Sequence, residues 1–261
     1  MKKALDIALP VAVAALVLGL WQWAVAHWQV PVYVLPAPSA ILRAFADNFA
    51  SLMTSLLSTL TVTVEAFLAA TILGTATAIA FSQSRLLERT LYPYAVILQV
   101  TPVVAIAPLI LIWVGFERIN LALCIIATIV AFFPILAGAT LGLKSADFNL
   151  IDLGRLYGAS PMQILWRIRL PTALPYLLSG MKTAGGLALI GAVVAEFVAG
   201  SGTATGLAWR IVESGNRLEI ATLFAALMLL AVTGVFIFAA LSLLEWLLLR
   251  RWHESAISHQ S

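Results

Sequence analysis

The sequence predicts an all-α, polytopic membrane protein with six transmembrane helices, on the basis of its composition and of its apolar segments. Of its 261 residues, 62% are hydrophobic and only 10% are charged, which is too little polar surface to cover a water-soluble core of this size. The apolar segments are long enough to cross about 30 Å of hydrocarbon as helices. They lack the alternation with a period of two residues that a β-barrel requires. The segments are 8–26, 61–81, 92–114, 121–143, 183–200 and 220–249.

The positions of the basic residues predict how these helices are oriented, because Lys and Arg in short loops are retained in the cytoplasm. With the N-terminus inside, eleven basic residues are cytoplasmic and four lie outside. We therefore expect both termini in the cytoplasm, and the net charge of +3 needs no nucleic-acid partner. The inner set is Lys2, Lys3, Arg85, Arg89, Lys144, Arg155, Arg167, Arg169, Lys182, Arg250 and Arg251; the outer set is Arg43, Arg118, Arg210 and Arg217.

The first apolar segment also has features of a signal peptide. Lys2 and Lys3 precede it, and it ends in Ala-Val-Ala at 24–26, which fits a cleavage site. Its end is rich in tryptophan, as interfacial anchors are. We expect the segment to be retained as the first membrane helix.

The segment after the first span predicts a short amphipathic helix on the outer membrane face. Pro36 and Pro38 cannot continue a helix, and Ser39 is well placed as its N-cap. We expect a structural spacer rather than a substrate-binding element. The apolar face consists of Leu42, Phe45, Ala46, Phe49, Leu52 and Met53.

Two predicted spans carry small residues at every fourth position, a pattern that lets helix backbones approach closely in lipid. We expect both spans to be buried in the bundle or at a subunit contact. Pro93, Pro102 and Pro108 fall in the third span, and each removes a backbone donor, so we expect that helix to be kinked or split. The stripes are Ala66, Ala70, Gly74 and Ala78 in the second span, and Gly180, Ala184, Ala188 and Ala192 in the fifth.

No motif in the sequence predicts an enzyme active site, a cofactor or a metal centre. A Gly-x-x-x-x-Gly-Lys-Ser/Thr motif does not occur, so the chain has no recognisable means of binding ATP itself. The single cysteine, Cys124, lies in the fourth span, where a thiol behaves as a small apolar group. Glycines at 200, 202 and 206 follow a membrane span rather than a strand, which predicts a plain loop. The histidines His27, His253 and His259 are scattered, which argues against a metal site.

Two acidic residues, Glu65 and Glu196, lie inside predicted spans, where a carboxylate is costly and usually faces a water-filled path or a partner. Glu196 continues the small-residue stripe of the fifth span by one more step of four. For Glu196, a place on the substrate path and a role as hydrogen-bonded helix contact are equally open. For Glu65, the role as a hydrogen-bonded helix contact near the interface is favoured, because the nearby Thr59, Thr61 and Thr63 suggest a polar interfacial turn.

The segment 152–171, DLGRLYGASPMQILWRIRLP, is a polar interruption predicted to lie in the cytoplasm. Its first residues can end a helix, Gly158 permits a turn, Ser160 can cap the next short helix and Pro161 can begin it. That helix has an apolar content that a free loop would not need, which indicates docking into the groove of a partner. The apolar residues are Met162, Ile164, Leu165, Trp166 and Ile168.

On these residues the chain resembles the permease subunits of bacterial ATP-binding-cassette importers, in the nitrate/sulfonate/taurine-type branch of the binding-protein-dependent (MetI-like) family. The family signature is Glu-Ala-Ala, three residues, Gly, nine residues and Ile-x-Leu-Pro. Gly158 and 168–171 match in register, whereas Asp152-Leu153-Gly154 replaces Glu-Ala-Ala. Further matches occur, in order, at 35–39, 101–109, 113–116 and 189–197.

The resemblance implies a subunit of the bacterial cytoplasmic (inner) membrane, without enzymatic activity or cofactor, that forms the path for a small polar solute such as nitrate, a sulfonate, taurine or a pyrimidine. It implies a homodimer in membrane lipid, two cytosolic ATP-binding subunits, and a periplasmic or lipid-anchored substrate-binding protein. The implied coupling residues are Asp152, Gly158, Ala159, Ser160, Pro161, Ile164, Arg167, Leu170 and Pro171. The predicted path residues, which do not depend on the resemblance, are Glu196, Glu65 and Pro102.

We expect three segments: residues 1–55 with the first span and outer linker, 56–250 with the permease core and a coupling loop at 144–182, and 251–261 as a cytoplasmic tail. The main alternative function is a secondary transporter driven by an ion gradient, with Glu65 and Glu196 as proton or ion carriers. It requires inverted repeats, and no convincing internal repeat is found. A membrane scaffold that docks a partner without transport is the third reading.

Overall fold

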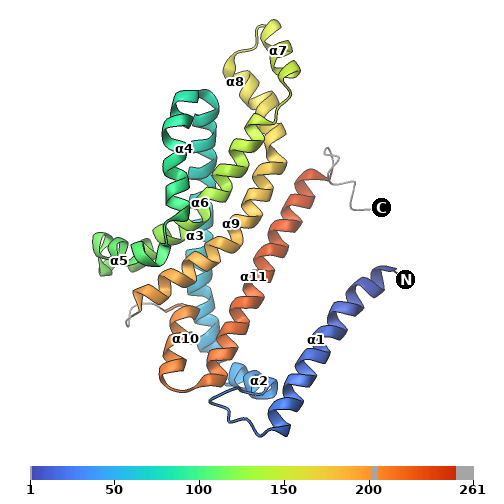
Figure 1. Ribbon diagram of the computed structural model, residues 1–261, viewed down its shortest axis with the longest axis vertical. Helices are drawn as coiled ribbons and strands as arrows, with labels where there is room; N and C mark the ends of the chain where they lie inside the picture. Colours follow the sequence, from blue (N-terminus) through green and yellow to red (C-terminus); the bar gives the residue numbers. More distant parts are fainter. Residues whose placement is uncertain (1, 201–204, 251–261) are drawn as a thin grey trace. The chain divides into compact units, whose positions relative to one another are not determined.

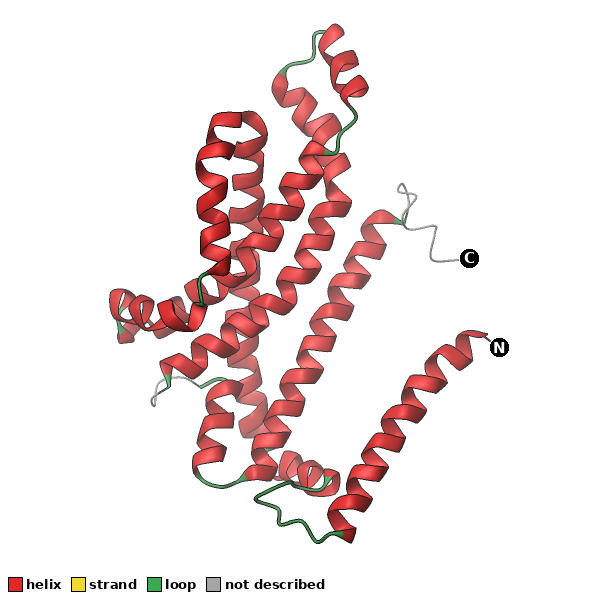
Figure 2. Ribbon diagram, viewed as in Figure 1, coloured by secondary structure: helices red, strands yellow, loops and turns green. Residues whose placement is uncertain are grey.

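A computed structural model describes residues 2–200 and 205–250 of the chain, and all of their regular structure is helical (Figure 2). The helices, labelled as in Figure 1, are α1 (Lys2–His27), α2 (Pro38–Asp47), α3 (Phe49–Gln83), α4 (Arg85–Val100), α5 (Val103–Val114), the 3-10 turn η1 (Phe116–Arg118), α6 (Ile119–Lys144), α7 (Phe148–Leu156), α8 (Pro161–Ile164), the π-helical turn η2 (Leu165–Arg169), α9 (Leu170–Ala199), α10 (Leu207–Asn216) and α11 (Ile220–Leu249).

The six predicted spans are all found as helices, the third of them broken. Among the described residues, five helical segments are long and apolar enough to cross a membrane, and they contain α1, α3, α6, α9 and α11. Helices α4 and α5 pass the same test together but meet at a bend of 102°. Counted as one broken span, this pair gives the sixth.

The break between α4 and α5 lies at Pro102. Thr101 before it is extended, with φ −69° and ψ 127°, because the proline ring pushes the preceding residue out of the α region. Pro102 also has no N–H with which to continue the helix. The other two prolines, Pro93 and Pro108, lie inside α4 and α5 without ending them. The predicted split is therefore confirmed and is located at one of the three prolines.

The contacts divide the chain into two compact units, each built from two stretches of sequence. Unit 1 comprises Met1–Ser58 and Thr205–Val232, and unit 2 comprises Thr59–Ala204 and Thr233–Ser261. All residues predicted for coupling and for the substrate path belong to unit 2. The predicted tail 251–261, with Arg251, His253 and His259, lies outside the described residues, as do positions 201–204 of the predicted loop.

In unit 1, helix α2 begins at Pro38, so the prediction of Ser39 as its N-cap was wrong. Ala37 is the N-cap and Pro38 occupies the first helical position, where a proline loses no hydrogen bond and its fixed φ already suits a helix. The backbone N–H of Ser39 donates instead to Gln22 Oε1 at 3.1 Å. The Gln22 side chain of α1 thus accepts a hydrogen bond from the first turn of α2.

The apolar face predicted for this helix is also interrupted. Helix α2 ends at Asp47, and Asn48, with φ −107° and ψ 16°, separates it from α3. The Asn48 side-chain amide donates to Ala44 O at 3.0 Å and to Thr222 Oγ1 at 3.4 Å. Phe49 and the residues after it therefore belong to a different helix.

In unit 2, the two small-residue stripes are buried as predicted, and α6 is their common partner. A Cβ atom at Gly74 of α3 would lie 2.9 Å from Cγ2 of Ile135, and one at Gly180 of α9 would lie 2.7 Å from the carbonyl oxygen of Pro134. Neither approach leaves room for a side chain. Helices α6 and α9 run side by side and share the largest helix contact (Figure 1).

The helix that contains the fifth predicted span is longer than that span, because it begins at Pro161 rather than near residue 183. Helix α8, the turn η2 and α9 follow one another without a break, so the coupling loop predicted for 144–182 ends at residue 160. Pro171 explains the π-helical turn: its ring would clash with the carbonyl of Arg167 in a regular helix, and one wider turn relieves that clash.

Candidate functional site

The predicted coupling segment forms two short helices joined by a tight turn in unit 2. Asp147 caps α7 by accepting a hydrogen bond from Asn149 N at 2.8 Å. Gly158 ends the turn with φ +76°, in the left-handed region that residues other than glycine rarely adopt. Within the described part of the chain, and apart from its two neighbours in sequence, no residue has an atom within 4 Å of where its Cβ would be. Gly158 is therefore required for its backbone conformation and not for lack of space.

The start of α8 is fixed by a reciprocal pair of hydrogen bonds. Gln163 N donates to Ser160 Oγ at 3.3 Å, and Ser160 N donates to Gln163 Oε1 at 2.7 Å. Pro161 occupies the first helical turn. The expected roles of Ser160 as cap and Pro161 as first residue are both found. The sequence interpretation missed Gln163, which the Ser-x-x-Gln spacing of a capping box could have identified.

A small apolar core holds the two helices together. Ile151 of α7 and Ile164 of α8 are buried with Ala146, and Ala159 and Ile168 pack against them. Ile164 is only 6% exposed. It therefore stabilises the segment from inside and has little surface to offer to a partner.

The outer face of the same segment is strongly apolar. Leu156 and Tyr157 at the end of α7 are each 84% exposed, and Met162 and Trp166 on the next helix are 59% and 64% exposed. Beside them lies a shallow groove of about 340 Å³. Together these side chains form an exposed apolar patch, which is unusual for a segment outside the membrane. The groove is lined by Leu150, Leu153, Gly154, Tyr157, Arg167, Ile168, Pro171 and Thr172.

The remaining predicted coupling residues lie around this surface with different roles. Asp152 is exposed and forms an ion pair with Arg155 at 3.0 Å. Arg167 and Pro171 line the groove. Leu170, in contrast, packs inward against the core of unit 2 that contains Leu165.

Residues 153 and 154, which differ from the family signature, lie where the difference does not disturb the packing. A Cβ atom at Gly154 would meet Ile168 Cδ1 at 3.5 Å and Ile164 Cγ1 at 3.7 Å, which are ordinary contact distances. An alanine would therefore fit at Gly154. Leu153 is half exposed at 49% and lines the groove, so this residue adds to the exposed apolar patch and does not disturb the core.

The two acids predicted for the substrate path do not come together. Glu196 is buried at 1% exposure, and Thr59 of α3 donates a hydrogen bond to its Oε1 at 2.8 Å. Thr63 donates to the backbone carbonyl of Thr59 at 2.7 Å. Glu65 is exposed on another face of α3, in the middle of a continuous helix. The polar turn expected around Glu65 is absent, because α3 runs unbroken through this stretch.

A charged pair that sequence interpretation missed joins α9 to α11 within unit 2. Lys182 forms an ion pair with Glu245, and its Nζ lies 5.7 Å from the ring centre of Phe238. Each charged side chain is 26% exposed. Lys182 had been assigned to a loop, but it lies in α9. Glu245, an acid within the last apolar segment, was the available signal.

Comparison with known proteins now assigns the family. The family described as "Binding-protein-dependent transport system inner membrane component" matches residues 68–252. A probable ABC transporter permease protein of Haemophilus influenzae is 30% identical over 92% of this chain and 95% of its own length. A riboflavin transport system permease protein of Chloroflexus aurantiacus is 34% identical, over 92% of this chain and 88% of its own.

A solved structure of the same fold is a chain of the MetNI methionine ABC transporter in an inward-facing conformation. It has a TM-score of 0.66 and 21% identity, over 76% of this chain and 96% of the other. Other relatives are named for the transport of formylaminopyrimidine, aliphatic sulfonates, taurine and nitrate, which confirms the predicted branch. Members of this family work with an ATP-binding subunit and a substrate-binding protein. The chain therefore belongs to the binding-protein-dependent inner membrane components, as a multi-pass permease subunit of an ATP-binding-cassette importer in the cytoplasmic membrane.

Proposed function

We propose that this subunit receives the energy of ATP hydrolysis through the surface formed by α7, the Gly158 turn and α8. The observation that carries the proposal is the division of this segment into a closed inner core and an exposed apolar outer face. Large exposed apolar side chains on a rigid, capped helix pair are suited to the groove of a partner protein. The partner is the cytosolic ATP-binding subunit.

The helix that follows gives this surface a mechanical connection to the membrane part of unit 2. From Pro161 to Ala199 the backbone remains helical. A displacement of α8 therefore moves α9, whose buried stripe packs against α6 and whose Glu196 is bound by Thr59 of α3. We propose that closure of two ATP-binding subunits moves α9 in each copy of a homodimer and exposes the path to alternate sides.

We also propose distinct roles for the three predicted path residues. Glu65 faces the path, because an exposed carboxylate in the middle of a span is costly against lipid and is tolerated in a water-filled passage. Glu196 acts indirectly, by holding α3 to α9. Pro102 provides the bend between α4 and α5.

The solute is proposed to be a small polar molecule, delivered by a periplasmic or lipid-anchored substrate-binding protein. Relatives named for riboflavin and formylaminopyrimidine share 34% and 31% of aligned residues with this chain, and the taurine and nitrate relatives share 29% and 25%. This order favours a nitrogen heterocycle over a small inorganic anion. Thermal-shift screening of the cognate binding protein with riboflavin, a pyrimidine, taurine and nitrate tests the order directly.

We infer transport without catalysis by this subunit, and without an ion gradient as the energy source. A gradient-driven relay needs carriers that exchange protons or ions along one path. Glu196 is enclosed and hydrogen-bonded, whereas Glu65 lies on a different face of α3. Uptake into liposomes that contain the full transporter should therefore require ATP. The ATP must be supplied on the side of the membrane where the ATP-binding subunits lie. Uptake driven by a proton or sodium gradient in the absence of ATP would contradict the proposal.

The coupling surface is tested by removing its two largest exposed aromatic side chains. The double variant Tyr157→Ala with Trp166→Ala should lose most co-purifying ATP-binding subunit and most ATP-driven uptake. A matched control is Tyr94→Ala with Trp113→Ala, which removes aromatic side chains that are 67% and 76% exposed elsewhere in unit 2. Equal loss of the ATP-binding subunit in both variants would show that the surface has no special role.

A further inference from the structure

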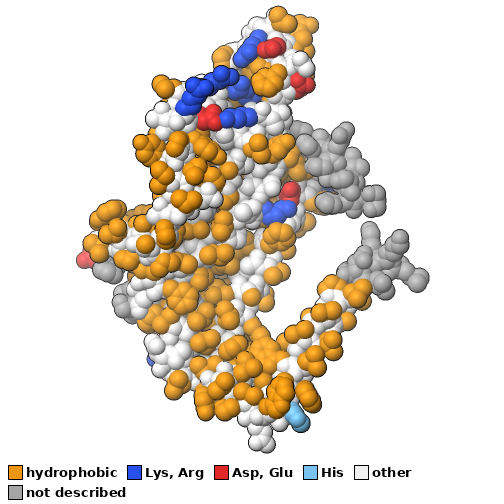
Figure 3. All heavy atoms as spheres, in the orientation of Figure 1, with side chains coloured by type: hydrophobic (Ala, Val, Ile, Leu, Met, Phe, Trp, Pro, Cys, Tyr) orange, Lys and Arg blue, Asp and Glu red, His pale blue; other side chains and the backbone are white. Residues whose placement is uncertain are grey.

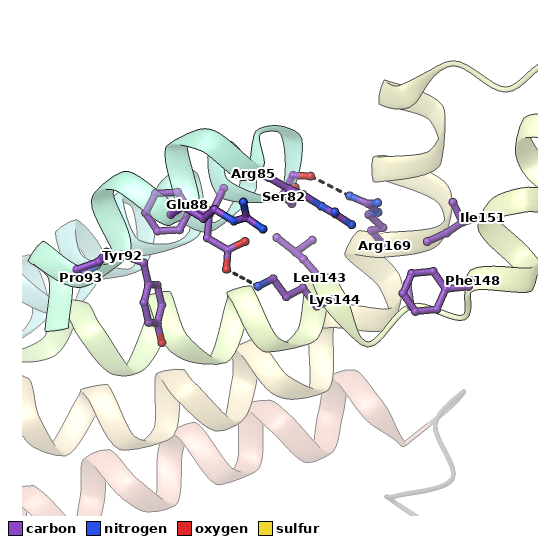
Figure 4. Close-up of a pocket in the computed structure, with 13 residues that line it drawn as sticks. Ser82, Arg85, Glu88, Tyr92, Pro93, Leu143, Lys144, Phe148, Ile151 and Arg169 are labelled. Atoms are coloured by element: carbon purple, nitrogen blue, oxygen red, sulfur yellow. Dashed lines mark hydrogen bonds and ion pairs between the residues drawn. The ribbon is translucent and has the colours of Figure 1, made fainter.

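A second cavity in unit 2 lies on the other side of α7 from the shallow groove of about 340 Å³ described above. It has a volume of about 610 Å³ and is formed where α3 ends, α4 begins and α6 ends, with η2 and the start of α7 closing it (Figure 4). Phe148 and Ile151 line it from α7, whereas the groove uses Leu150, Leu153 and Tyr157. The two sites therefore use different faces of the same short helix.

The wall of this cavity carries an excess of positive charge. Arg85, Arg89, Lys144 and Arg169 all line it, against one acid, Glu88. Lys144 forms an ion pair with Glu88, so this acid is already used. Among residues 2–200 and 205–250, neither Arg85 nor Arg89 has an ion-pair partner. Three guanidinium groups are thus left without a carboxylate, at the end of unit 2 where basic side chains gather (Figure 3).

Arg169 is held in place with part of its hydrogen-bonding capacity unused. Its Nη1 donates to the backbone carbonyl of Ser82 at 3.0 Å, which fixes the side chain between η2 and the end of α3. Its Nε is buried and has no hydrogen-bond partner within the described part of the chain. A buried donor without an acceptor costs free energy, and Arg169 lines the cavity, so an anion bound there would lie beside a guanidinium group with an unused donor.

The first turn of α4 adds to the same field. Ser84 caps this helix by accepting a hydrogen bond from Leu87 N at 3.3 Å, and Arg85 and Glu88 of its first turn line the cavity. The N-terminus of a helix carries a partial positive charge that favours anions. Guanidinium groups offer forked pairs of donors that match the oxygens of a phosphate.

We propose that this cavity binds a phosphate-bearing anion, supplied by the headgroup of an anionic phospholipid or by free phosphate. The position of the cavity favours the lipid, because it opens at the ends of two membrane spans, α3 and α6. On the adjoining α4, Leu86, Leu91 and Tyr94 are exposed and offer apolar surface to acyl chains. Basic pockets between membrane helices at the cytoplasmic side attract such headgroups.

The test uses the purified transporter, with its ATP-binding subunits, in mixed micelles that contain phosphatidylcholine alone or with phosphatidylglycerol. Retained lipid is counted by native mass spectrometry. The wild type should retain phosphatidylglycerol in preference to phosphatidylcholine, and Arg85→Gln with Arg89→Gln should lower the apparent affinity about tenfold or more. The control is Arg43→Gln with Arg118→Gln, which removes the same charge from exposed positions outside the cavity. This variant should retain phosphatidylglycerol as the wild type does.

A competition experiment with inorganic phosphate distinguishes a lipid headgroup from free phosphate as the ligand. If millimolar phosphate displaces phosphatidylglycerol from the wild type and raises its unfolding temperature, the phosphate chemistry is supported with a free anion as the source. If phosphate does neither and the lipid is retained, the headgroup is the source. Arg85→Lys with Arg89→Lys keeps the charge and should retain part of the binding. Arg89→Gln alone, at an exposed position, provides the measurement if the double variant does not fold.

Three results would overturn the proposal. Equal retention of phosphatidylglycerol and phosphatidylcholine by the wild type would show no anion site. Equal loss in the control variant would show attraction by net charge alone. Binding that occurs in the isolated permease but disappears when the ATP-binding subunits are present would assign the cavity to the protein contact.

Discussion

At the scale of single residues, Gly158 has a backbone angle that decides which amino acids the position accepts. Its φ of +76° costs a residue with a Cβ atom roughly 1–2 kcal/mol, and a β-branched residue meets this strain most severely. We expect Gly158→Val to uncouple ATP hydrolysis from transport or to prevent assembly with the ATP-binding subunit. ATPase activity and uptake, measured on the same proteoliposomes, give the ratio that checks this.

Two controls separate conformation from the mere loss of a glycine. Gly158→Asn should keep more coupling than Gly158→Val, because asparagine tolerates the left-handed region better. Gly186→Ala, at a helical position in α9 with nothing within 4 Å of the added atom, should leave coupling unchanged. Normal uptake by Gly158→Val would refute a role for this turn.

The Glu196 carboxyl group depends on a hydrogen bond from another helix. With only 1% of Glu196 exposed, loss of the 2.8 Å bond from Thr59 leaves a buried polar atom with one donor fewer. We expect Thr59→Val to lower the free energy of unfolding by about 1–3 kcal/mol. Thr77→Val is the control, since Thr77 is half-buried on the same helix and its hydroxyl donates to the carbonyl of Leu73 within that helix. Equal unfolding temperatures of the two variants in detergent would contradict the prediction.

At the scale of elements, local rules predicted the turn and the cap but not the ends of the helices. Ser160, Pro161 and Gly158 behave as expected because each acts through its own neighbours. Ser39 failed as a cap because the helix already begins at Pro38, and Gln22, 17 residues earlier, accepts the hydrogen bond from the Ser39 N–H. The start of the helix that contains the fifth span was not predicted, because Pro171 is accommodated by a π-helical turn, which spacing alone does not reveal.

The acids show the same limit for the candidate site. Sequence correctly identified Glu196 as unusual, since a carboxylate on a small-residue stripe must face another helix. It did not identify Thr59 as its partner, because that contact joins residues 137 positions apart. Nor did it pair Lys182 with Glu245, because the register of α9 against α11 follows from packing.

The Lys182–Glu245 pair gives a prediction about how α9 and α11 are held together within unit 2. Lys182→Met leaves the Glu245 carboxylate without this partner, so the free energy of unfolding should fall by about 1–3 kcal/mol. This is less than for a fully buried pair, because each side chain is 26% exposed. The double variant Lys182→Met with Glu245→Gln should recover part of the loss. Additive losses in a double-mutant cycle, measured by thermal unfolding, would show that the pair contributes no coupling energy.

At the scale of the whole molecule, composition and the length of the apolar segments predicted a helical membrane protein. Lipid offers no hydrogen bonds, so an apolar segment that crosses it must pair its own backbone N–H and C=O groups, as a helix does. The exposed apolar side chains of α1 and α11 fit that environment. The signature from Gly158 to Pro171 predicted the family, since it links a turn, a cap and a helix start at fixed spacing. The basic cavity was not predicted, because its charges come from three elements, α4, α6 and η2, that are separate in sequence.

The bias of the basic residues predicts the orientation of the chain, which can be measured with single cysteines. Arg155 and Arg217 are exposed at 64% and 62% of their side-chain surface, and the bias assigns Arg155 to the cytoplasm and Arg217 to the outer side. In a Cys124→Ser background, which removes the one native thiol, a membrane-impermeant maleimide should label Arg217→Cys on intact spheroplasts. It should label Arg155→Cys only in inverted vesicles. The reverse pattern would show that the predicted orientation is wrong. The coupling surface and the basic cavity would then lie on the outer side and not on the cytoplasmic side.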